Sequence, residues 1–156
     1  MKQNRVLVCG AGSIGKRHIN NLVKLGAEVS VWRNRKGLLD EINRTYAVRT
    51  CKDLKAGIAA ADAVVIATAT DKHMSIAIDT LQAGRALFIE KPLSSAWTGM
   101  ENLLKLGKDK IVEVGCQLRV HPSLVVLTEM LSKGKGGPPL TYRLVMGHRL
   151  DAWRPG

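Results

Sequence analysis

Short continuous apolar runs alternate along this chain with longer stretches in which apolar residues recur every three or four positions. The runs have the length of β-strands and lie at residues 6–9, 27–32, 63–67, 86–89 and 111–115, with a further short strand around Val48. The stretches between them predict helices at residues 13–25, 37–44, 52–61, 74–84 and 96–106. Strands and helices that alternate at this pitch predict an α/β fold, a doubly wound parallel sheet with its ligand at the carboxyl ends of the strands.

The pattern changes beyond residue 116. Residues 122–133 predict a helix, residues 134–139 a loop rich in glycine and proline, and residues 140–146 alternate in part, like the first strand of a different sheet. A strand without partners cannot cover its edge or its apolar face. We therefore expect one domain over residues 1–118 and, over residues 119–156, the truncated start of an α+β second domain.

Three glycines break the chain directly after the first strand, with the spacing G-x-G-x-x-G. Gly10 would make the tight turn, Gly12 would let a pyrophosphate approach the backbone, and Gly15 would let the following helix pack close to the strand. That helix begins at Ser13 and Ile14, where free N–H groups and the positive end of the helix dipole would face the phosphates. The motif alone is weak, but the strand before it and the helix after it are the context it needs. A Rossmann-type dinucleotide site follows, the alternative being a glycine turn without a ligand.

The end of the second predicted strand bears on which dinucleotide is bound. An Asp or Glu about 20 residues past the glycines would hold the 2′-hydroxyl of the adenosine ribose. This chain has Arg33 and Asn34 there, followed by Arg35 and Lys36, and no carboxylate is near. Arg33 can form a bidentate pair with a 2′-phosphate, which predicts NADP, with NAD as the alternative. The cations could instead lie in a solvated turn, with the ribose held by the backbone and Asn34.

The composition narrows the class of protein. The formal net charge of +11 admits a nucleic acid, but aromatic residues make up only 4% of the chain and no stacking platform is visible, so we expect none. The longest apolar stretch, residues 58–69, contains Asp62 and is too short for a membrane span. Three widely spaced cysteines without a C-x-x-C are typical of reduced, buried thiols in a cytoplasmic protein without a metal site.

Several motifs together resemble the Gfo/Idh/MocA oxidoreductases, the family of glucose–fructose oxidoreductase and inositol dehydrogenase. They are the glycine fingerprint at residues 10–15, the stretch 62–68 followed by His73, and Glu90-Lys91-Pro92-Leu93. Residues 119–122 resemble that family's entry into its second domain. Where the family usually has A-T-P-N, this chain has Ala67 and Thr68 followed by Ala69 and Thr70.

The resemblance implies roles for individual residues. Lys91 would be catalytic, moving the proton of a carbinol hydroxyl as the carbonyl forms. Glu90 would hold Lys91 or the nicotinamide ribose, although a structural ion pair is the alternative, and Pro92 resembles the family's cis-proline. Ala67, Thr68 and His73 would line the cofactor side of the site, with capping or packing beneath the cofactor as the other role for His73.

Five further residues are less central to the prediction. His121 could face the nicotinamide or the surface, whereas His18 and His148 are interpreted as structural. Trp153 and Arg154 resemble a W-R pair found near the active site of some members.

The resemblance also implies the function. We expect the cofactor-binding portion of an NAD(P)-dependent dehydrogenase that transfers a hydride between nicotinamide and a sugar, polyol or sugar-phosphate-type substrate. The truncated chain is expected to be inactive alone, and it could form a homo-oligomer through an uncovered strand edge. The alternative is a non-catalytic nucleotide-binding or regulatory domain with the same fold.

Overall fold

The computed structural model describes residues 3–33, 39–134, 136–143, 145 and 147. The chain divides into two compact units, residues 1–116 and residues 117–156. Asn34 and His148, together with Trp153 and Arg154, lie outside the described residues.

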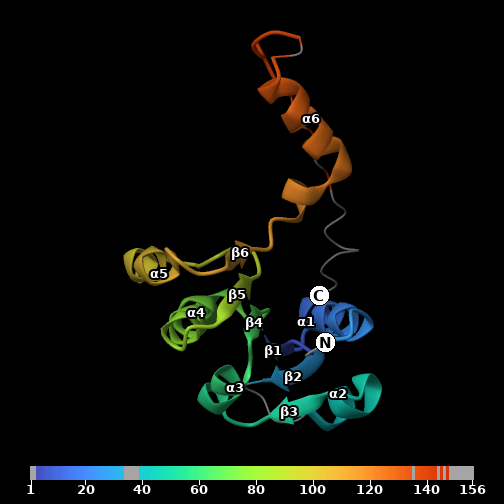
Figure 1. Cartoon of the computed structure of the whole chain (residues 1–156), viewed down its shortest axis with the longest axis vertical. Coiled ribbons are helices and arrows are strands. Elements are labelled where there is room, and N and C mark those ends of the chain that lie inside the picture. Colours follow the sequence, from blue (N-terminus) through green and yellow to red (C-terminus); the bar gives the residue numbers. More distant parts are fainter. Residues whose placement is uncertain (1–2, 34–38, 135, 144, 146, 148–156) are drawn as a thin grey trace. The chain divides into compact units, whose positions relative to one another are not determined.

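The first unit is built on one parallel sheet of six strands in the order β3-β2-β1-β4-β5-β6 (Figure 1). The strands are β1 Arg5–Cys9, β2 Glu28–Trp32, β3 Arg49–Cys51, β4 Ala63–Ile66, β5 Ala86–Ile89 and β6 Val112–Val114. The strand order reverses between β1 and β4, which pair in parallel from Val6 with Ala63 to Cys9 with Ile66. The predicted doubly wound Rossmann-type sheet is confirmed, and ligands of such sheets bind beyond this reversal point.

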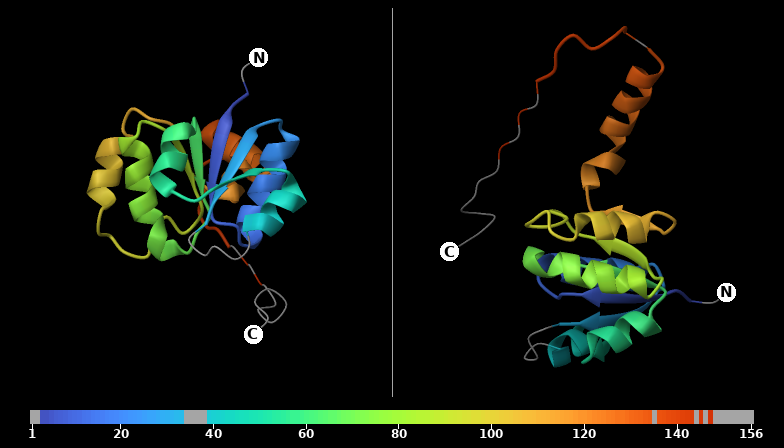
Figure 2. Two further views of the ribbon diagram at one scale, coloured as in Figure 1. Left: turned by 90° about the horizontal axis from the view of Figure 1, so that it is seen from below. Right: turned by 90° about the vertical axis from the view of Figure 1, so that its left-hand side faces the viewer.

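Helices cover both faces of the sheet, as the two views of Figure 2 and the labels of Figure 1 show. One face carries α1 Ser13–Lys24 and α2 Leu39–Tyr46, and the other carries α3 Leu54–Ala60, α4 His73–Gln82 and α5 Met100–Gly107. A 3₁₀ turn, η2 Thr70–Lys72, leads directly into α4. The helical layers follow from right-handed crossovers between parallel strands.

Alternate residues of each strand enter opposite cores. Leu7 and Cys9 of β1 pack with α3, α4 and α5, whereas Val6 and Val8 pack with Ile19 of α1. The same alternation divides β4, since Val64 and Ile66 join the first core and Val65 the second. Both faces of the central strands are therefore buried, which explains their continuous apolar sequences.

The boundaries of α5 differ from the expected helix at residues 96–106. The helix begins at Met100, and Gly99 before it has a φ of +86°, in the left-handed region that a right-handed helix cannot include. Residues 94–96 form a local turn, in which the Ser94 hydroxyl accepts from the Ala96 N–H at 3.1 Å.

The second unit contains a short 3₁₀ helix, η3 Gln117–Val120, and α6 Pro122–Ser132. The expected helix is thus confirmed. The strand expected over residues 140–146 is wrong for the residues described there, 140–143 and 145, none of which pairs with another strand. Alternation along one segment does not make a strand unless a neighbour takes its backbone hydrogen bonds.

Candidate functional site

The glycine turn is packed so closely that two of its three glycines have no room for a side chain. Gly10 has a φ of +102°, and a Cβ on it would collide with the backbone carbonyl of Ala67. A Cβ on Gly15 would collide with the backbone carbonyl of Gly10. Gly12 differs, since nothing lies within 4 Å of a Cβ built there. The turn therefore presses β1, α1 and the end of β4 together and leaves open space beside Gly12.

That open space belongs to a cavity of about 640 Å³ at the carboxyl ends of β1, β2 and β4. The cavity gathers five of the predicted site residues, Gly10, Gly12, Arg33, Ala67 and Thr68. The other lining residues are Ala11, Trp32, Leu54, Ala69, Asp71, Lys72, Ser75 and Ile76. Ser13, Ile14 and Gly15 form the first turn of α1, whose leading N–H groups have no partner within the helix.

Two cationic side chains, Arg33 and Lys72, belong to residues that line this cavity. Arg33 follows the last residue of β2, and its Nη1 atom is buried without a hydrogen-bond partner among the described residues. Lys72 forms an exposed ion pair with Asp71 at 3.2 Å, and both residues line the cavity. A buried guanidinium nitrogen without a partner is costly, and an anionic ligand group would supply the missing acceptor.

The Glu90-Lys91-Pro92 segment lies at the end of β5 and does not line the cavity. The Glu90 backbone N–H donates to the Ile66 carbonyl at 2.9 Å, which continues the pairing of β4 with β5. The Lys91–Pro92 peptide bond is cis, as the resemblance implies. Lys91 is exposed, and its backbone N–H donates to Glu90 Oε2 at 3.2 Å.

His73 is fully buried, with 1% of its surface exposed, and it connects the two loops that flank the end of the sheet. Its Nδ1 lies 3.0 Å from the Pro92 carbonyl oxygen, and its Nε2 lies 3.1 Å from the Thr68 carbonyl oxygen. A neutral imidazole has one N–H and can donate to one of these carbonyls at a time. This arrangement favours the packing role over direct contact with a ligand.

His18, which the sequence analysis interprets as structural, contacts a predicted site residue, Glu90. Its Nε2 lies 2.8 Å from Glu90 Oε1. The two residues are 72 positions apart in sequence. They meet because α1 covers the face of the sheet from which the Glu90 side chain projects, just after β5. No sequence pattern signals this pair, since it depends on the order of the strands.

Only one of the three cysteines is buried as expected, and Cys51 is half-buried. Cys9 is buried, and burial, with a smaller contribution from Cys51, raises the pKa of its thiol to about 12. Cys116 is exposed, because it comes after the end of β6 and not within the strand. The described residues contain no group of three or more His, Cys, Asp or Glu side chains able to hold a metal ion.

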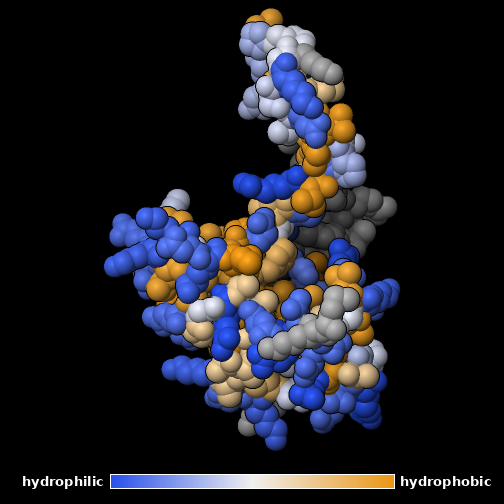
Figure 3. All heavy atoms as spheres, viewed as in Figure 1, coloured by the Kyte–Doolittle hydropathy of each residue, from blue (hydrophilic) through white to orange (hydrophobic). Residues whose placement is uncertain are grey.

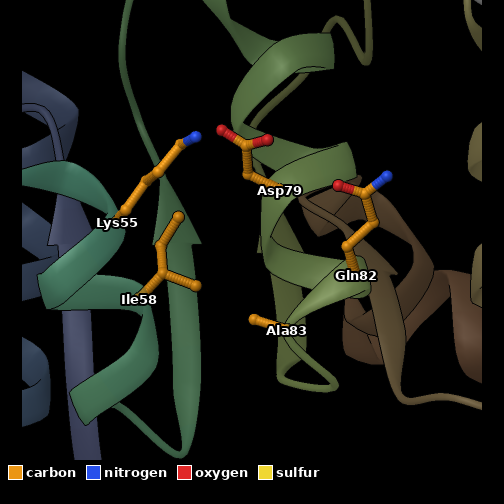
Figure 4. Close-up of a pocket in the computed structure, with 5 residues that line it drawn as sticks. All are labelled: Lys55, Ile58, Asp79, Gln82 and Ala83. Atoms are coloured by element: carbon orange, nitrogen blue, oxygen red, sulfur yellow. The ribbon is translucent and has the colours of Figure 1, made fainter.

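A smaller cavity, of about 230 Å³, lies between α3 and α4 and is lined by Lys55, Ile58, Asp79, Gln82 and Ala83. Figure 4 shows the Lys55 and Asp79 side chains directed toward each other across its opening. None of the predicted site residues lies there.

The comparisons with known proteins identify the family. Residues 4–118 match the oxidoreductase family with an NAD-binding Rossmann fold, GFO_IDH_MocA, and the chain belongs to it. The resemblance inferred from the motifs is confirmed.

Two curated relatives show how far the similarity extends. The chain is 32% identical to inositol 2-dehydrogenase/D-chiro-inositol 3-dehydrogenase of Shouchella clausii, over 90% of this chain and 44% of that protein. It is 26% identical to UDP-N-acetylglucosamine 3-dehydrogenase of Acidithiobacillus ferrooxidans, over 97% of this chain and 47% of that protein. The chain therefore spans less than half the length of these relatives.

Among solved structures, the WlbA dehydrogenase of Bordetella pertussis, in complex with NADH and UDP-GlcNAcA, matches with a TM-score of 0.77. The identity is 26%, over 86% of this chain and 42% of that one. All three of these relatives are named as dehydrogenases. Within the described residues, no helix has the length and apolar character needed to cross a bilayer.

Proposed function

We propose that this chain is the cofactor-binding part of an NAD(P)-dependent dehydrogenase that acts on a sugar or polyol. The observation that carries the proposal is the cavity of about 640 Å³ built on the glycine turn at the reversal point of the sheet. The two crowded glycines and the open position at Gly12 fit a pyrophosphate that lies directly on the backbone. The substrate class is supported by the names of the relatives, which include inositol and UDP-sugar dehydrogenases.

In this proposal, different residues along the carboxyl edge of the sheet bind the cofactor and transfer the proton. Gly12 and the N–H groups of Ser13 and Ile14 bind the pyrophosphate, and Ala67 and Thr68 also line the cavity, next to Gly10. A bound nicotinamide dinucleotide supplies the hydride chemistry. Lys91 takes the proton of the substrate hydroxyl at Nζ during oxidation and returns it during reduction.

The preferred dinucleotide in this proposal is NADP. Arg33 supports it, because this residue lines the cavity and its buried Nη1 lacks a partner among the described residues. A 2′-phosphate would satisfy that nitrogen with a charge-assisted hydrogen bond. A preference for NAD, measured as the lower dissociation constant, would contradict this part of the proposal without affecting the rest.

Calorimetric titration of the 156-residue chain with NADP and NAD tests the binding site. Gly12→Val should abolish the binding heat, because the valine side chain would occupy the space beside the turn. The fold should tolerate the change, since Gly12 has a φ of −72° and a ψ of −170°, which any residue adopts, and nothing lies within 4 Å.

The matched control is Ala60→Val, which adds the same side chain at an exposed position of α3 outside the cavity. This control should bind like the original chain. A chain that binds neither dinucleotide, or a Gly12→Val chain that binds normally, would overturn the proposal. The inactivity of the 156-residue chain alone stays a prediction, which steady-state assays with sugars and polyols would check.

A further inference from the structure

We propose that His18 is a positioning residue for the nicotinamide end of the site. In this inference, His18 holds the Glu90 carboxylate, and Glu90 in turn fixes the turn that carries Lys91. The inference rests on the proposed function, because it assigns the end of β5 to the nicotinamide half of the cofactor.

The Glu90 carboxylate is held on three sides. His18 Nε2 lies 2.8 Å from Oε1, and the Lys91 backbone N–H donates to Oε2 at 3.2 Å. The third side is the backbone of Gly115, where a Cβ would come within 3.2 Å of the carboxyl carbon and both oxygens. Since an ionised carboxylate only accepts hydrogen bonds, the proton of the pair lies on His18 Nε2.

The imidazole of His18 is itself fixed in place. Its ring packs edge-on against Phe88, with the centroids 5.2 Å apart and the planes inclined by 64°. Phe88 lies in β5, and Glu90 directly follows that strand and continues its pairing with β4. Because the two residues are two positions apart, both side chains project from the same face of the sheet, the face that α1 covers. The side chains of His18 and Glu90 are only 23% and 18% exposed, which limits competition from water for their hydrogen bond.

This geometry gives α1 two functions in the same site. Its N-terminus binds the pyrophosphate in the proposed function, and His18, one and a half turns further on, reaches across β4 to the end of β5. Movement of Glu90 would release the Lys91 N–H and free the backbone that carries the catalytic side chain. The expected effect is therefore confined to the nicotinamide half of the ligand.

Ligand truncation separates positioning from general stability. ADP contains the adenosine and pyrophosphate parts but no nicotinamide riboside. His18→Leu, which removes the hydrogen bond and keeps an apolar side chain beside Phe88, should weaken binding of the dinucleotide at least about tenfold while leaving that of ADP within about twofold. His18→Gln, which keeps an N–H donor, should restore most of the affinity. Asn21→Leu, at an exposed position of the same helix, is the matched control and should change neither constant.

A double-mutant cycle tests whether His18 acts through Glu90. In a Glu90→Gln chain, adding His18→Leu should change the dinucleotide affinity by less than about twofold, because the partner carboxylate is already absent. Full additivity of the two changes would contradict the inference. Equal losses of affinity for ADP and for the dinucleotide in His18→Leu would do so as well, since they would indicate a merely structural role.

A measurement without cofactor keeps this inference separable from the proposed function. The Lys91 amide should exchange its hydrogen at least about tenfold faster in His18→Leu than in the original chain, and at the original rate in Asn21→Leu. An unchanged rate in His18→Leu would overturn the positioning role. A chain that binds no dinucleotide would contradict the proposed function, and the exchange rates would still decide the role of His18.

Discussion

Single residues at the edge of the sheet decide which ligand groups the site can recognise. Arg33 stands at the end of β2, the position where an acidic residue would bind an adenosine 2′-hydroxyl. Its Nη1 is buried and has no hydrogen-bond partner among the described residues, and in the proposed function a 2′-phosphate would supply that partner. The residue type was readable from the sequence, whereas the burial of one nitrogen required the structure.

Reversing the charge at Arg33 should invert the cofactor preference. Arg33→Asp is expected to raise the dissociation constant for NADP at least about tenfold, because a carboxylate would repel the 2′-phosphate and the guanidinium would be lost. The dissociation constant for NAD should fall or stay within about threefold, since Asp can accept from a 2′-hydroxyl. Lys105→Asp, the same change of charge at an exposed position of α5, should leave both constants unchanged in calorimetry.

At the scale of elements, the β1–α1 junction depends on contacts between backbones. Gly15 is buried in the first turn of α1 against the carbonyl of Gly10, and Gly10 is held by its N–H, which donates to the Trp32 carbonyl at 2.9 Å. The carbonyl of Gly10, which faces Gly15, is part of the backbone and cannot move aside as a flexible side chain would. The spacing of the glycines predicted these functions correctly because each one follows from the geometry of the turn.

Gly15→Ala should therefore destabilise the fold, although alanine is the better helix former. Alanine gains at most about 1 kcal/mol of helix propensity. Forcing a methyl group against a fixed carbonyl costs about 1–3 kcal/mol, and the collision should prevail. Thermal unfolding should show a lower midpoint for Gly15→Ala and no appreciable change for Gly12→Ala, which has open space. An equal midpoint in both variants would contradict this account of the turn.

At the scale of the whole chain, the unit of residues 1–116 contains every element of the sheet, both hydrophobic cores and the larger cavity. The α6 helix of the second unit has no such core, because its large apolar side chains are exposed. These side chains are distributed around the helix and are not confined to one face. Hydrophobic atoms are visible at its surface in Figure 3, whereas hydrophilic residues are spread widely over the first unit. Exposed apolar surface of this kind favours association with other protein surfaces.

Shortening the chain should separate dinucleotide binding from self-association. A chain that ends at Cys116 is expected to bind the dinucleotide within about twofold of the 156-residue chain, and to elute as a monomer in size-exclusion chromatography with light scattering. The 156-residue chain should show a mass that rises with concentration, because α6 exposes apolar side chains. Loss of dinucleotide binding in the shortened chain, or a strict monomer for the longer one, would contradict these expectations.

The sequence by itself determined the α/β class, the approximate positions of the six strands of the sheet, and the close packing at Gly10 and Gly15. These features depend on local periodicity and turn geometry, which neighbouring residues set. The predicted start of α5 was wrong by several residues, because the apolar pattern does not reveal the left-handed backbone at Gly99. The prediction of a strand over residues 140–146 was wrong for the residues described there. A strand forms only when a neighbouring strand takes its backbone hydrogen bonds, and the alternation of residues does not show whether such a neighbour is present.

Only the tertiary structure decided how distant residues meet. The strand order brings α1 over β5, so that His18 reaches Glu90 across 72 positions of sequence. The same order buries His73 between the carbonyls of Thr68 and Pro92, and His73 is not among the residues that line the larger cavity. Such contacts depend on which strands become neighbours, a property of the whole sheet that no local pattern in the sequence encodes.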